Sequence, residues 1–215
     1  MGAEPGERLG CNHMESFAPA GQHEWNERYA TTDRMWRMDP DEALVELAGD
    51  LEPGRAVDLG AGEGRNSLWL ARAGWDVTAV DLSSVALDRL GERAASEGLD
   101  VTTVAGDIEQ HLGGGFRYDL VVMANIHTEP TLRTSLFAAA TGAVDTGGHL
   151  FVVGHHLDSL GIAGPPDPER LYTEEMLAGA LAGLEILRLY REDHAHGDLE
   201  VPAVNLVAWA VRPAR

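Results

Sequence analysis

The chain has 215 residues, and 16 Lys plus Arg against 35 Asp plus Glu give it a formal net charge of −19 at pH 7. The negative electrostatic field of such a chain repels the phosphate backbones of nucleic acids, and no local basic patch offsets it. We therefore expect no nucleic-acid partner. No apolar run approaches the roughly 18 residues of a membrane span, and there is no secretory signal pattern, so we expect a cytoplasmic protein with no membrane partner.

The length favours one compact domain. A chain of this size buries roughly 70% of the surface that its unfolded form exposes, so it needs no disulfide or structural metal. Its single cysteine, Cys11, has no partner within the chain. Residues 1–22 are polar and rich in Gly, Pro and Glu, which predicts a disordered tail before a domain over residues 23–215.

Short apolar segments alternate with helical patterns along the chain after an amphipathic helix expected over 41–48. The helix over 83–97 has Ala86, Leu90 and Ala94 four residues apart and Ser83 or Ser84 as its cap. The alternation predicts parallel strands joined by helices. The expected strands are 56–59, 77–80, 101–104, 120–123 and, after a turn at Gly147-Gly148, 150–153; the expected helices between them are 65–73, 83–97 and 131–144.

Two further strands are expected over 185–191 and 203–211. The polar segment between them is short enough to join antiparallel neighbours. The sequence therefore predicts an α/β fold with a seven-stranded, mostly parallel sheet, an antiparallel last strand and helices on both faces.

Three glycines, Gly60, Gly62 and Gly64, directly follow the first expected strand. Ligands of open α/β sheets bind at the carboxyl ends of strands, and glycine lets backbone N–H groups approach them closely. The nicotinamide dinucleotide motif would need a third glycine at position 65, which is Arg65. Asp81 ends the second strand, 21 residues after Gly60, a spacing at which a carboxylate accepts ribose hydroxyls in either kind of cofactor.

The segment from Val57 to Asn66, followed in order by Asp81 and Asp107, resembles the class I S-adenosylmethionine-dependent methyltransferases. The resemblance implies a single-domain Rossmann-like methyltransferase fold, with S-adenosylmethionine as methyl donor and S-adenosylhomocysteine as product. The glycines would hold the methionine part, Leu82 and Ile108 would flank the adenine, and Asp107 would bind its amino group. The cofactor-binding residues implied in this part of the chain are Gly60, Ala61, Gly62, Asn66, Asp81, Leu82, Asp107, Ile108 and Asn125.

A narrower resemblance is to the tellurite-resistance and thiopurine-type branch of these enzymes. It rests on Gly64-Arg65-Asn66-Ser67, on His127, and on Gly161 to Pro168 with Leu171-Tyr172-Thr173. Trp25-Asn26-Glu27-Arg28-Tyr29 and Trp36 are similar to the cofactor lid of that branch, here within residues 23–50. This implies that Tyr29 and Trp36 bind the cofactor. The alternative is that these aromatic residues belong to the core of an N-terminal helix.

Two of the nine histidines, His127 and His155, lie at strand ends that should face the ligand. We predict that they are the catalytic side chains, which contact the acceptor or take its proton. His155 and His156 are adjacent in a strand and point to opposite faces, whereas His194 and His196 could share an ion. We nevertheless predict no bound metal.

The sequence thus predicts a methyltransferase with a small-molecule acceptor that is thiol-like, an oxygen, a nitrogen or a metalloid. A non-catalytic cofactor-binding protein with the same fold remains an alternative. A nicotinamide-dependent oxidoreductase is disfavoured by Arg65. The acceptor and the oligomeric state stay open.

Overall fold

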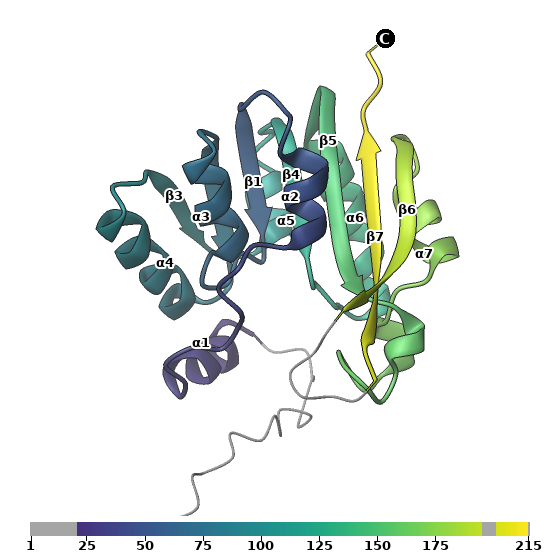
Figure 1. Cartoon of the computed structure of the whole chain (residues 1–215), viewed down its shortest axis with the longest axis horizontal. Helices are drawn as coiled ribbons and strands as arrows, with labels where there is room; N and C mark the ends of the chain where they lie inside the picture. Colours follow the sequence, from purple (N-terminus) through teal and green to yellow (C-terminus); the bar gives the residue numbers. More distant parts are fainter. Residues whose placement is uncertain (1–20, 195–200, 215) are drawn as a thin grey trace, which may run out of the picture.

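The computed structural model describes residues 21–194 and 201–214, so the expected disordered tail falls almost wholly outside the described residues. These residues form a seven-stranded sheet in the order β3-β2-β1-β4-β5-β7-β6 (Figure 1). The strands are β1 (Arg55–Leu59), β2 (Asp76–Asp81), β3 (Val101–Ala105), β4 (Tyr118–Ala124), β5 (Val144–His155), β6 (Glu185–His194) and β7 (Ala203–Val211). The helices are α1 (Gln22–Ala30), α2 (Glu42–Ala48), α3 (Arg65–Arg72), α4 (Ser84–Ser96), α5 (Ile108–Leu112), α6 (Pro130–Ala143), α7 (Glu174–Ala180) and the short 3-10 turns η1 (Leu157–Ser159) and η2 (Pro168–Arg170).

The strand directions confirm the predicted sheet. Strands β1 to β5 pair in parallel, and β7 is antiparallel both to β5 and to β6. The order reverses next to β1, because β2 and β3 lie on one side of it and β4 on the other. A crevice at the carboxyl ends of β1 and β4 is therefore the expected ligand position.

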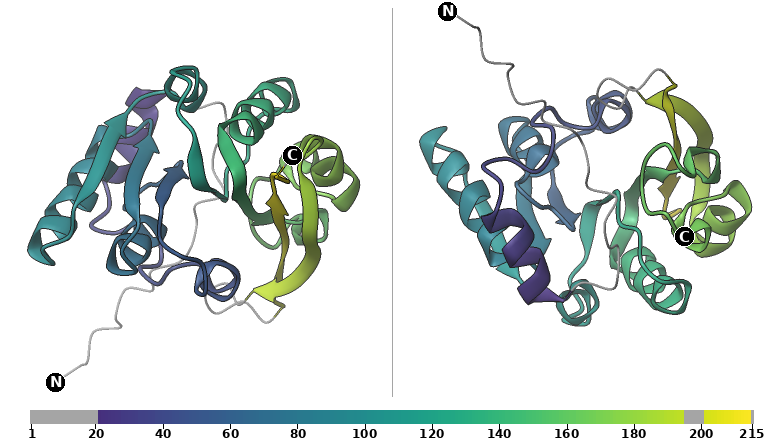
Figure 2. Two further views of the ribbon diagram at one scale, coloured as in Figure 1. Left: turned by 90° about the horizontal axis from the view of Figure 1, so that it is seen from above. Right: turned by 90° about the horizontal axis from the view of Figure 1, so that it is seen from below.

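Helices cover both faces of the sheet, as Figure 2 shows along the strands. Alternate residues of β1 enter different cores, because successive strand side chains point to opposite faces. Val57 and Leu59 pack in the core under α5, α6 and α7, whereas Ala56 packs in the core under α2 and α3. Leu90 and Ala94 of α4 are buried against Leu68 and Ala79, which confirms the predicted packing face of that helix. Each fully buried leucine contributes about 1.5–3 kcal/mol to this packing.

Strand β5 is longer than predicted. The expected turn at Gly147-Gly148 is wrong, because both glycines lie inside the strand. Gly147 donates to Arg212 O at 2.8 Å, and Arg212 donates back to Gly148 O at 2.9 Å. The pairing of β4 with β5 shifts register between Tyr118 and Leu120, beside these glycines. Glycine inside a strand often marks such an irregularity rather than its end.

The N-terminal segment, defined here as residues 21–40, lies beside α4 rather than within the sheet (Figure 1). Asn26 Oδ1 accepts from Ser83 Oγ at 2.8 Å and from Val85 N at 3.4 Å, at the start of α4. Ser83 is the cap of that helix, since its side chain also accepts from Ala86 N. The cap of α4 thus also holds α1.

The last strand ends at the opposite end of the sheet from α1 (Figure 1). There Arg212 donates through Nε to Val144 O at 2.9 Å and through Nη2 to Thr141 O at 2.5 Å. In the part of the chain that the structure describes, no helix has the length and apolar character to cross a membrane.

Candidate functional site

The glycine loop, residues 60–64, joins β1 to α3 in a backbone conformation that other residues rarely adopt. Gly60, Gly62 and Gly64 have φ values of +66°, +54° and +79°. A Cβ on Gly64 would lie 2.1 Å from Leu90 Cδ1, and one on Gly60 would lie 3.1 Å from Ile126 Cγ1. Conformation and close packing together therefore require glycine here.

Asp81, at the end of β2, is bonded to this loop. Its Oδ2 accepts from Gly62 N at 2.8 Å, and its Oδ1 accepts from Ser83 N at 2.7 Å. Burial raises the pKa of Asp81, and the two backbone N–H groups partly offset that effect. Each carboxylate oxygen keeps a further lone pair for a ligand hydroxyl. Asp81 is thus joined to Gly62, and Gly60 and Ala61 of the same loop donate to Val80 O, next to Asp81; the contacts of these residues with a cofactor stay a prediction.

A second carboxyl group lies behind the loop. Asp58 is buried in β1 and accepts from Ser67 Oγ at 2.6 Å, which joins the end of β1 to the first turn of α3. Burial raises the pKa of Asp58 to about 6, and the Ser67 bond opposes that shift.

The predicted adenine-binding residues follow β2 and β3, whose ends are neighbours in the sheet. Leu82 and Ile108 are partly buried, whereas Asp107 is exposed. Asp107 caps α5, because its Oδ1 accepts from Gln110 N at 2.9 Å. Their roles toward adenine stay predictions.

Asn125 directly follows β4, on the far side of the crevice. Among the described residues other than glycine it alone has a positive φ, +57°. Its N–H donates to Val153 O at 2.8 Å, and its side chain is exposed. Asparagine tolerates this conformation better than most residues, and such backbone is often found at ligand sites.

The N-terminal segment places two aromatic residues at the glycine loop. Trp36 Nε1 donates to Tyr29 Oη at 2.9 Å, and a Cβ on Gly62 would lie 2.7 Å from Tyr29 Oη. Tyr29 is buried, whereas Trp36 is 48% exposed. Burial and the nearby negative charge of Asp81 raise the pKa of Tyr29. Tyr29 and Trp36 lie where a lid would lie, and their contact with the cofactor stays a prediction.

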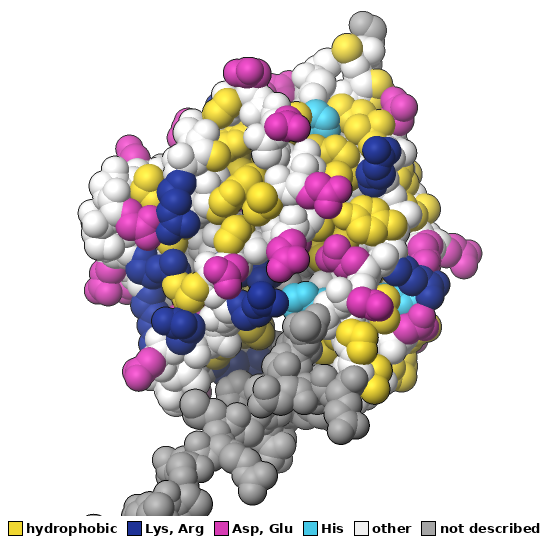
Figure 3. Space-filling view, in the orientation of Figure 1, with side chains coloured by type: hydrophobic (Ala, Val, Ile, Leu, Met, Phe, Trp, Pro, Cys, Tyr) yellow, Lys and Arg dark blue, Asp and Glu magenta, His cyan; other side chains and the backbone are white. Residues whose placement is uncertain are grey.

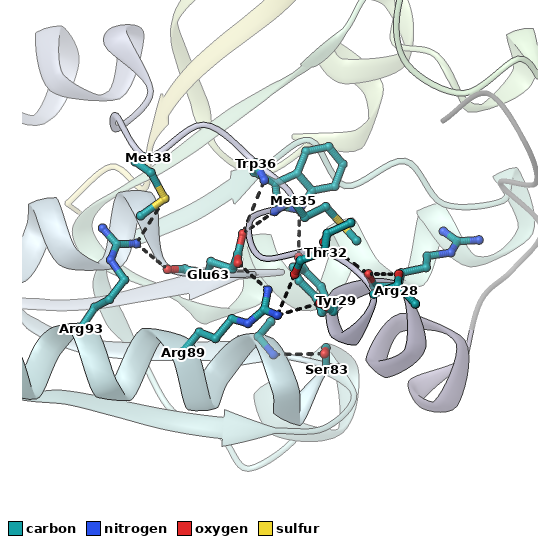
Figure 4. Close-up of polar contacts among 12 residues, drawn as sticks. Arg28, Tyr29, Thr32, Met35, Trp36, Met38, Glu63, Ser83, Arg89 and Arg93 are labelled. Atoms are coloured by element: carbon teal, nitrogen blue, oxygen red, sulfur yellow. Dashed lines mark hydrogen bonds and ion pairs between the residues drawn. The ribbon is translucent and has the colours of Figure 1, made fainter. Parts of the chain in front are cut away.

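Glu63 and Arg89, to which the sequence motifs assign no role, also lie at the glycine loop and bond to each other. The Glu63 side chain accepts from Met35 N, Trp36 N and Arg89 Nη1 (Figure 4). Two sequence signals could have indicated them: a charged residue between two glycines of the loop, and Arg89 and Arg93 four residues apart on the helix after Asp81.

Asn66 contacts the residue before α2. Its Oδ1 accepts from Asp41 N at 2.9 Å, and its side chain is buried between α3 and the start of α2. Arg65 Nη2 lies 3.5 Å from Asp41 Oδ2 in the same region. The structure gives Asn66 a role in holding α2, and its predicted contact with the cofactor gains no support.

Both ring nitrogens of His127 are bonded to the backbone. Nδ1 lies 3.0 Å from Arg170 O, and Nε2 accepts from His155 N at 3.2 Å. A carbonyl can only accept and an N–H can only donate, so Nδ1 carries the proton and the ring is neutral. Burial lowers the pKa of His127 to about 4. This geometry does not support the predicted proton-accepting role of His127.

His155 stacks on His127, and Gly164 covers its ring, where a Cβ would lie 2.6 Å from His155 Cδ2. The His155 ring, at the end of β5, thus contacts both the His127 ring and the loop before η2, and its catalytic role stays a prediction.

His156 takes part in a separate polar cluster. Its Nε2 lies 3.2 Å from Glu174 Oε2, and its Nδ1 accepts from Asp158 N at 3.0 Å. Within residues 21–194 and 201–214, no group of three or more His, Cys, Asp or Glu is placed to hold a metal ion. His196 lies outside the described residues.

Comparison with known proteins agrees with this geometry. Residues 56–148, from β1 into β5, match the family model of the methyltransferase domain.

Two curated relatives are similar in sequence. The ribosomal RNA small subunit methyltransferase C of Alcanivorax borkumensis is 31% identical over 159 residues, which is 70% of this chain and 48% of the relative. The probable S-adenosyl-L-methionine-dependent methyltransferase TehB of Haemophilus influenzae is 38% identical over 65 residues, which is 30% of this chain and 23% of TehB. The chain therefore spans about half, or less than half, of the length of these curated relatives.

Two solved structures share the fold. TehB from H. influenzae superposes with a TM-score of 0.68 at 22% identity, covering 89% of this chain and 66% of TehB. The N-methyltransferase NodS from Bradyrhizobium japonicum, in complex with S-adenosylhomocysteine, superposes with a TM-score of 0.70 at 18% identity, covering 90% of this chain and all of NodS (100%).

Proposed function

Because this chain belongs to the class I S-adenosylmethionine-dependent methyltransferases, we propose that it transfers a methyl group from S-adenosylmethionine to a small-molecule acceptor. The observation that carries the proposal is the bond between Asp81 and the glycine loop at the carboxyl ends of β1 and β2. In this proposal the Asp81 carboxylate would accept the ribose hydroxyls, beside the glycine backbone at the strand ends. We further propose that residues 23–215 form one methyltransferase domain.

The residues present fit the donor. The three glycines allow the positive-φ turn after β1, and Asp81 keeps accepting capacity on both oxygens. Leu82 and Ile108 offer partly buried apolar surface beside the exposed Asp107, which suits a flat ring with an amino group. Tyr29 and Trp36 would cover the ligand from the N-terminal segment.

S-adenosylmethionine supplies an electrophilic methyl group on a sulfonium. The work left to this chain is to hold donor and acceptor in line and to exclude water. The neutral His127 is fixed between two backbone groups, so in this proposal it shapes the acceptor side without removing a proton. An acceptor that is nucleophilic without a strong base fits this arrangement best.

The charge of the chain supports a small acceptor rather than RNA. The net charge is −19, and acidic side chains are spread over the face in Figure 3. Basic side chains gather on one side of that face, toward α1, α3 and α4. Two arginines of α3 and α4 are already paired with carboxylates, Arg72 with Glu97 and Arg89 with Glu63. Bonded arginines leave less charge for a phosphate backbone.

Thermal unfolding with added ligands tests the donor. We expect S-adenosylmethionine and S-adenosylhomocysteine to raise the Tm and the nicotinamide dinucleotides to leave it unchanged, because a ligand of the native state stabilises it. Stabilisation by the dinucleotides alone would overturn the proposal.

An acceptor screen tests the reaction. Methyl-labelled S-adenosylmethionine is incubated with thiols, phenols, amines, metalloid oxyanions and a structured RNA. We expect the labelled methyl group to be transferred to at least one class of small molecule. Label in RNA alone would overturn the small-molecule acceptor, and donor binding without any transfer would favour a non-catalytic binding protein.

A further inference from the structure

Glu63 forms a buried connection between the glycine loop and the N-terminal segment. Its carboxylate accepts from Met35 N at 3.0 Å and from Trp36 N at 3.4 Å, both through Oε2. Its side chain is only 8% exposed. These bonds fix the backbone that carries Trp36, whose indole bonds Tyr29. One residue of the loop thus positions the aromatic pair above that loop (Figure 4).

Arg89 of α4 completes the connection. Its Nη1 donates to Glu63 Oε1 at 2.9 Å, and its Nη2 donates to Tyr29 O at 2.8 Å and to Thr32 O at 2.7 Å. The planar guanidinium therefore joins the loop carboxylate to the backbone at the end of α1 and just after it. A lysine side chain has a single charged nitrogen, so it cannot donate from two separate nitrogens to the Glu63 carboxylate and to the two carbonyls at once.

Arg93 holds the same loop residue from one helical turn further along α4. Its Nη1 donates to the main-chain carbonyl of Glu63 at 3.1 Å. Residues four apart on a helix lie on the same face, so Arg89 and Arg93 bind the side chain and the carbonyl of Glu63 together. The loop conformation and the docking of the N-terminal segment therefore depend on the same residue.

We propose that Glu63 and Arg89 are positioning residues that couple the N-terminal segment to the glycine loop, so that closure over the donor and donor binding occur together. The inference rests on the proposed function, because it takes the donor to bind at the glycine loop. If the segment lifts away, the Glu63 carboxylate loses two donors and Arg89 loses two acceptors. A donor that binds the closed form also stabilises these bonds, and by linkage the bonds strengthen its binding.

Hydrogen exchange without ligand tests the connection itself. The amides of Met35 and Trp36 are read in the wild type, Glu63→Gln, Arg89→Lys and Arg89→Met. We expect at least tenfold faster exchange at both amides in Glu63→Gln and Arg89→Met, and an intermediate rate in Arg89→Lys, which keeps the charge. Arg72→Met is the matched control, because Arg72 forms a two-bond pair with Glu97 that does not contact the N-terminal segment.

Limited trypsin digestion gives a second readout of opening. The chain contains no lysine, so trypsin cleaves only after arginine, and Arg34 and Arg37 are exposed within the segment. We expect faster cleavage at these two sites in Glu63→Gln and Arg89→Met but not in Arg72→Met. Circular dichroism and a single cooperative thermal transition establish that each variant is folded.

Calorimetric titration with S-adenosylhomocysteine tests the coupling. We expect its Kd to rise about tenfold in Glu63→Gln and in Arg89→Met, the range for hydrogen bonds to charged groups. The double variant, with both Glu63→Gln and Arg89→Met, should bind about as weakly as either single variant. Each single change already breaks the hydrogen-bond connection that Glu63 and Arg89 form together. Arg72→Met should bind like the wild type.

Three results would overturn the proposal: unchanged exchange in folded variants, faster exchange with an unchanged Kd, or fully additive losses in the double variant. Failure of the wild type to bind S-adenosylhomocysteine would instead contradict the proposed function. The exchange experiment needs no ligand, so the two failures remain distinct.

Discussion

The imidazole rings of His127 and His155 stack with centroids 5.4 Å apart and planes 7° from parallel. Tyr172 also contacts the His127 ring, at a centroid distance of 5.0 Å, and its hydroxyl donates to Ile126 O. Two aromatic neighbours and two backbone bonds hold the His127 ring in one orientation. His127 thus connects the loop after β4 to the segment around Arg170.

His127 should make stability depend on pH. Its pKa is about 4 in the folded chain and 6.5 unperturbed, so from pH 6.5 down to 4 the unfolded chain binds a proton that the folded chain does not. We expect the free energy of unfolding to fall over that interval by up to about 3 kcal/mol from this group. Urea unfolding of the wild type and His127→Asn at pH 7.5 and 4.5 measures it.

The stability gap between the two proteins should narrow at pH 4.5. The raised pKa of Asp58 acts in the opposite direction, since a carboxyl group with a raised folded pKa favours the folded state as pH falls. Asp58 is present in both proteins, so its contribution to the pH dependence cancels when their free energies of unfolding are compared. A gap independent of pH would show that His127 does not titrate in this way.

Asp81 and Asp107 should respond differently to the same substitution. Asp81→Asn places an amide N–H₂ against one of two backbone donors, which should lower stability by about 1–3 kcal/mol and weaken S-adenosylhomocysteine binding. Asp107→Asn keeps a good helix cap, so stability should change by less than about 0.5 kcal/mol. Thermal unfolding and calorimetric titration measure both effects. Equal stability losses would contradict the assigned bonding.

Asn125 allows backbone conformation to be separated from side-chain function. At φ +57°, Asn125→Gly should preserve stability within about 0.5 kcal/mol, whereas Asn125→Ala should lose about 1 kcal/mol. If the amide group contacts the donor, both variants should bind S-adenosylhomocysteine equally weakly. Wild-type affinity in Asn125→Gly would assign Asn125 to the backbone alone.

Two helix caps provide a matched pair of substitutions. Ser83 caps α4 and also donates to Asn26, whereas Thr173 caps α7 by accepting from Met176 N. Ser83→Ala and Thr173→Ala should each lose about 1 kcal/mol of stability. Only Ser83→Ala should increase hydrogen exchange in α1. Equal exchange in both variants would show that Asn26 does not depend on the cap.

Local patterns predicted the sheet and the place of the glycine loop and Asp81 within it. The strands and helices follow from periodicity, because alternate residues of β1 and every fourth residue of α4 enter the core. Gly60 to Gly64 and Asp81 were found because chain spacing alone brings neighbouring parallel strand ends together.

The remaining contacts depend on residues distant in sequence. The Nδ1 partner of His127 is Arg170, and the partner of Asn66 is Asp41, so no local pattern shows which way either side chain turns. Glu63 bonds Met35, Trp36 and Arg89 from the N-terminal segment and α4. Its role became visible only once α1 and α4 were placed side by side.

The antiparallel course of β7 has a practical consequence for measurement. Strand β7 carries the described chain away from the glycine loop, and Arg212 ties its last residues to α6 and β5 at the far end of the sheet (Figure 1). A dye or surface linker attached just after Arg212 would lie far from the glycine loop. The same group on α1 would lie beside that loop, which Tyr29 contacts at Gly62, so sensor chips and fluorescence reporters should be built on the β7 side.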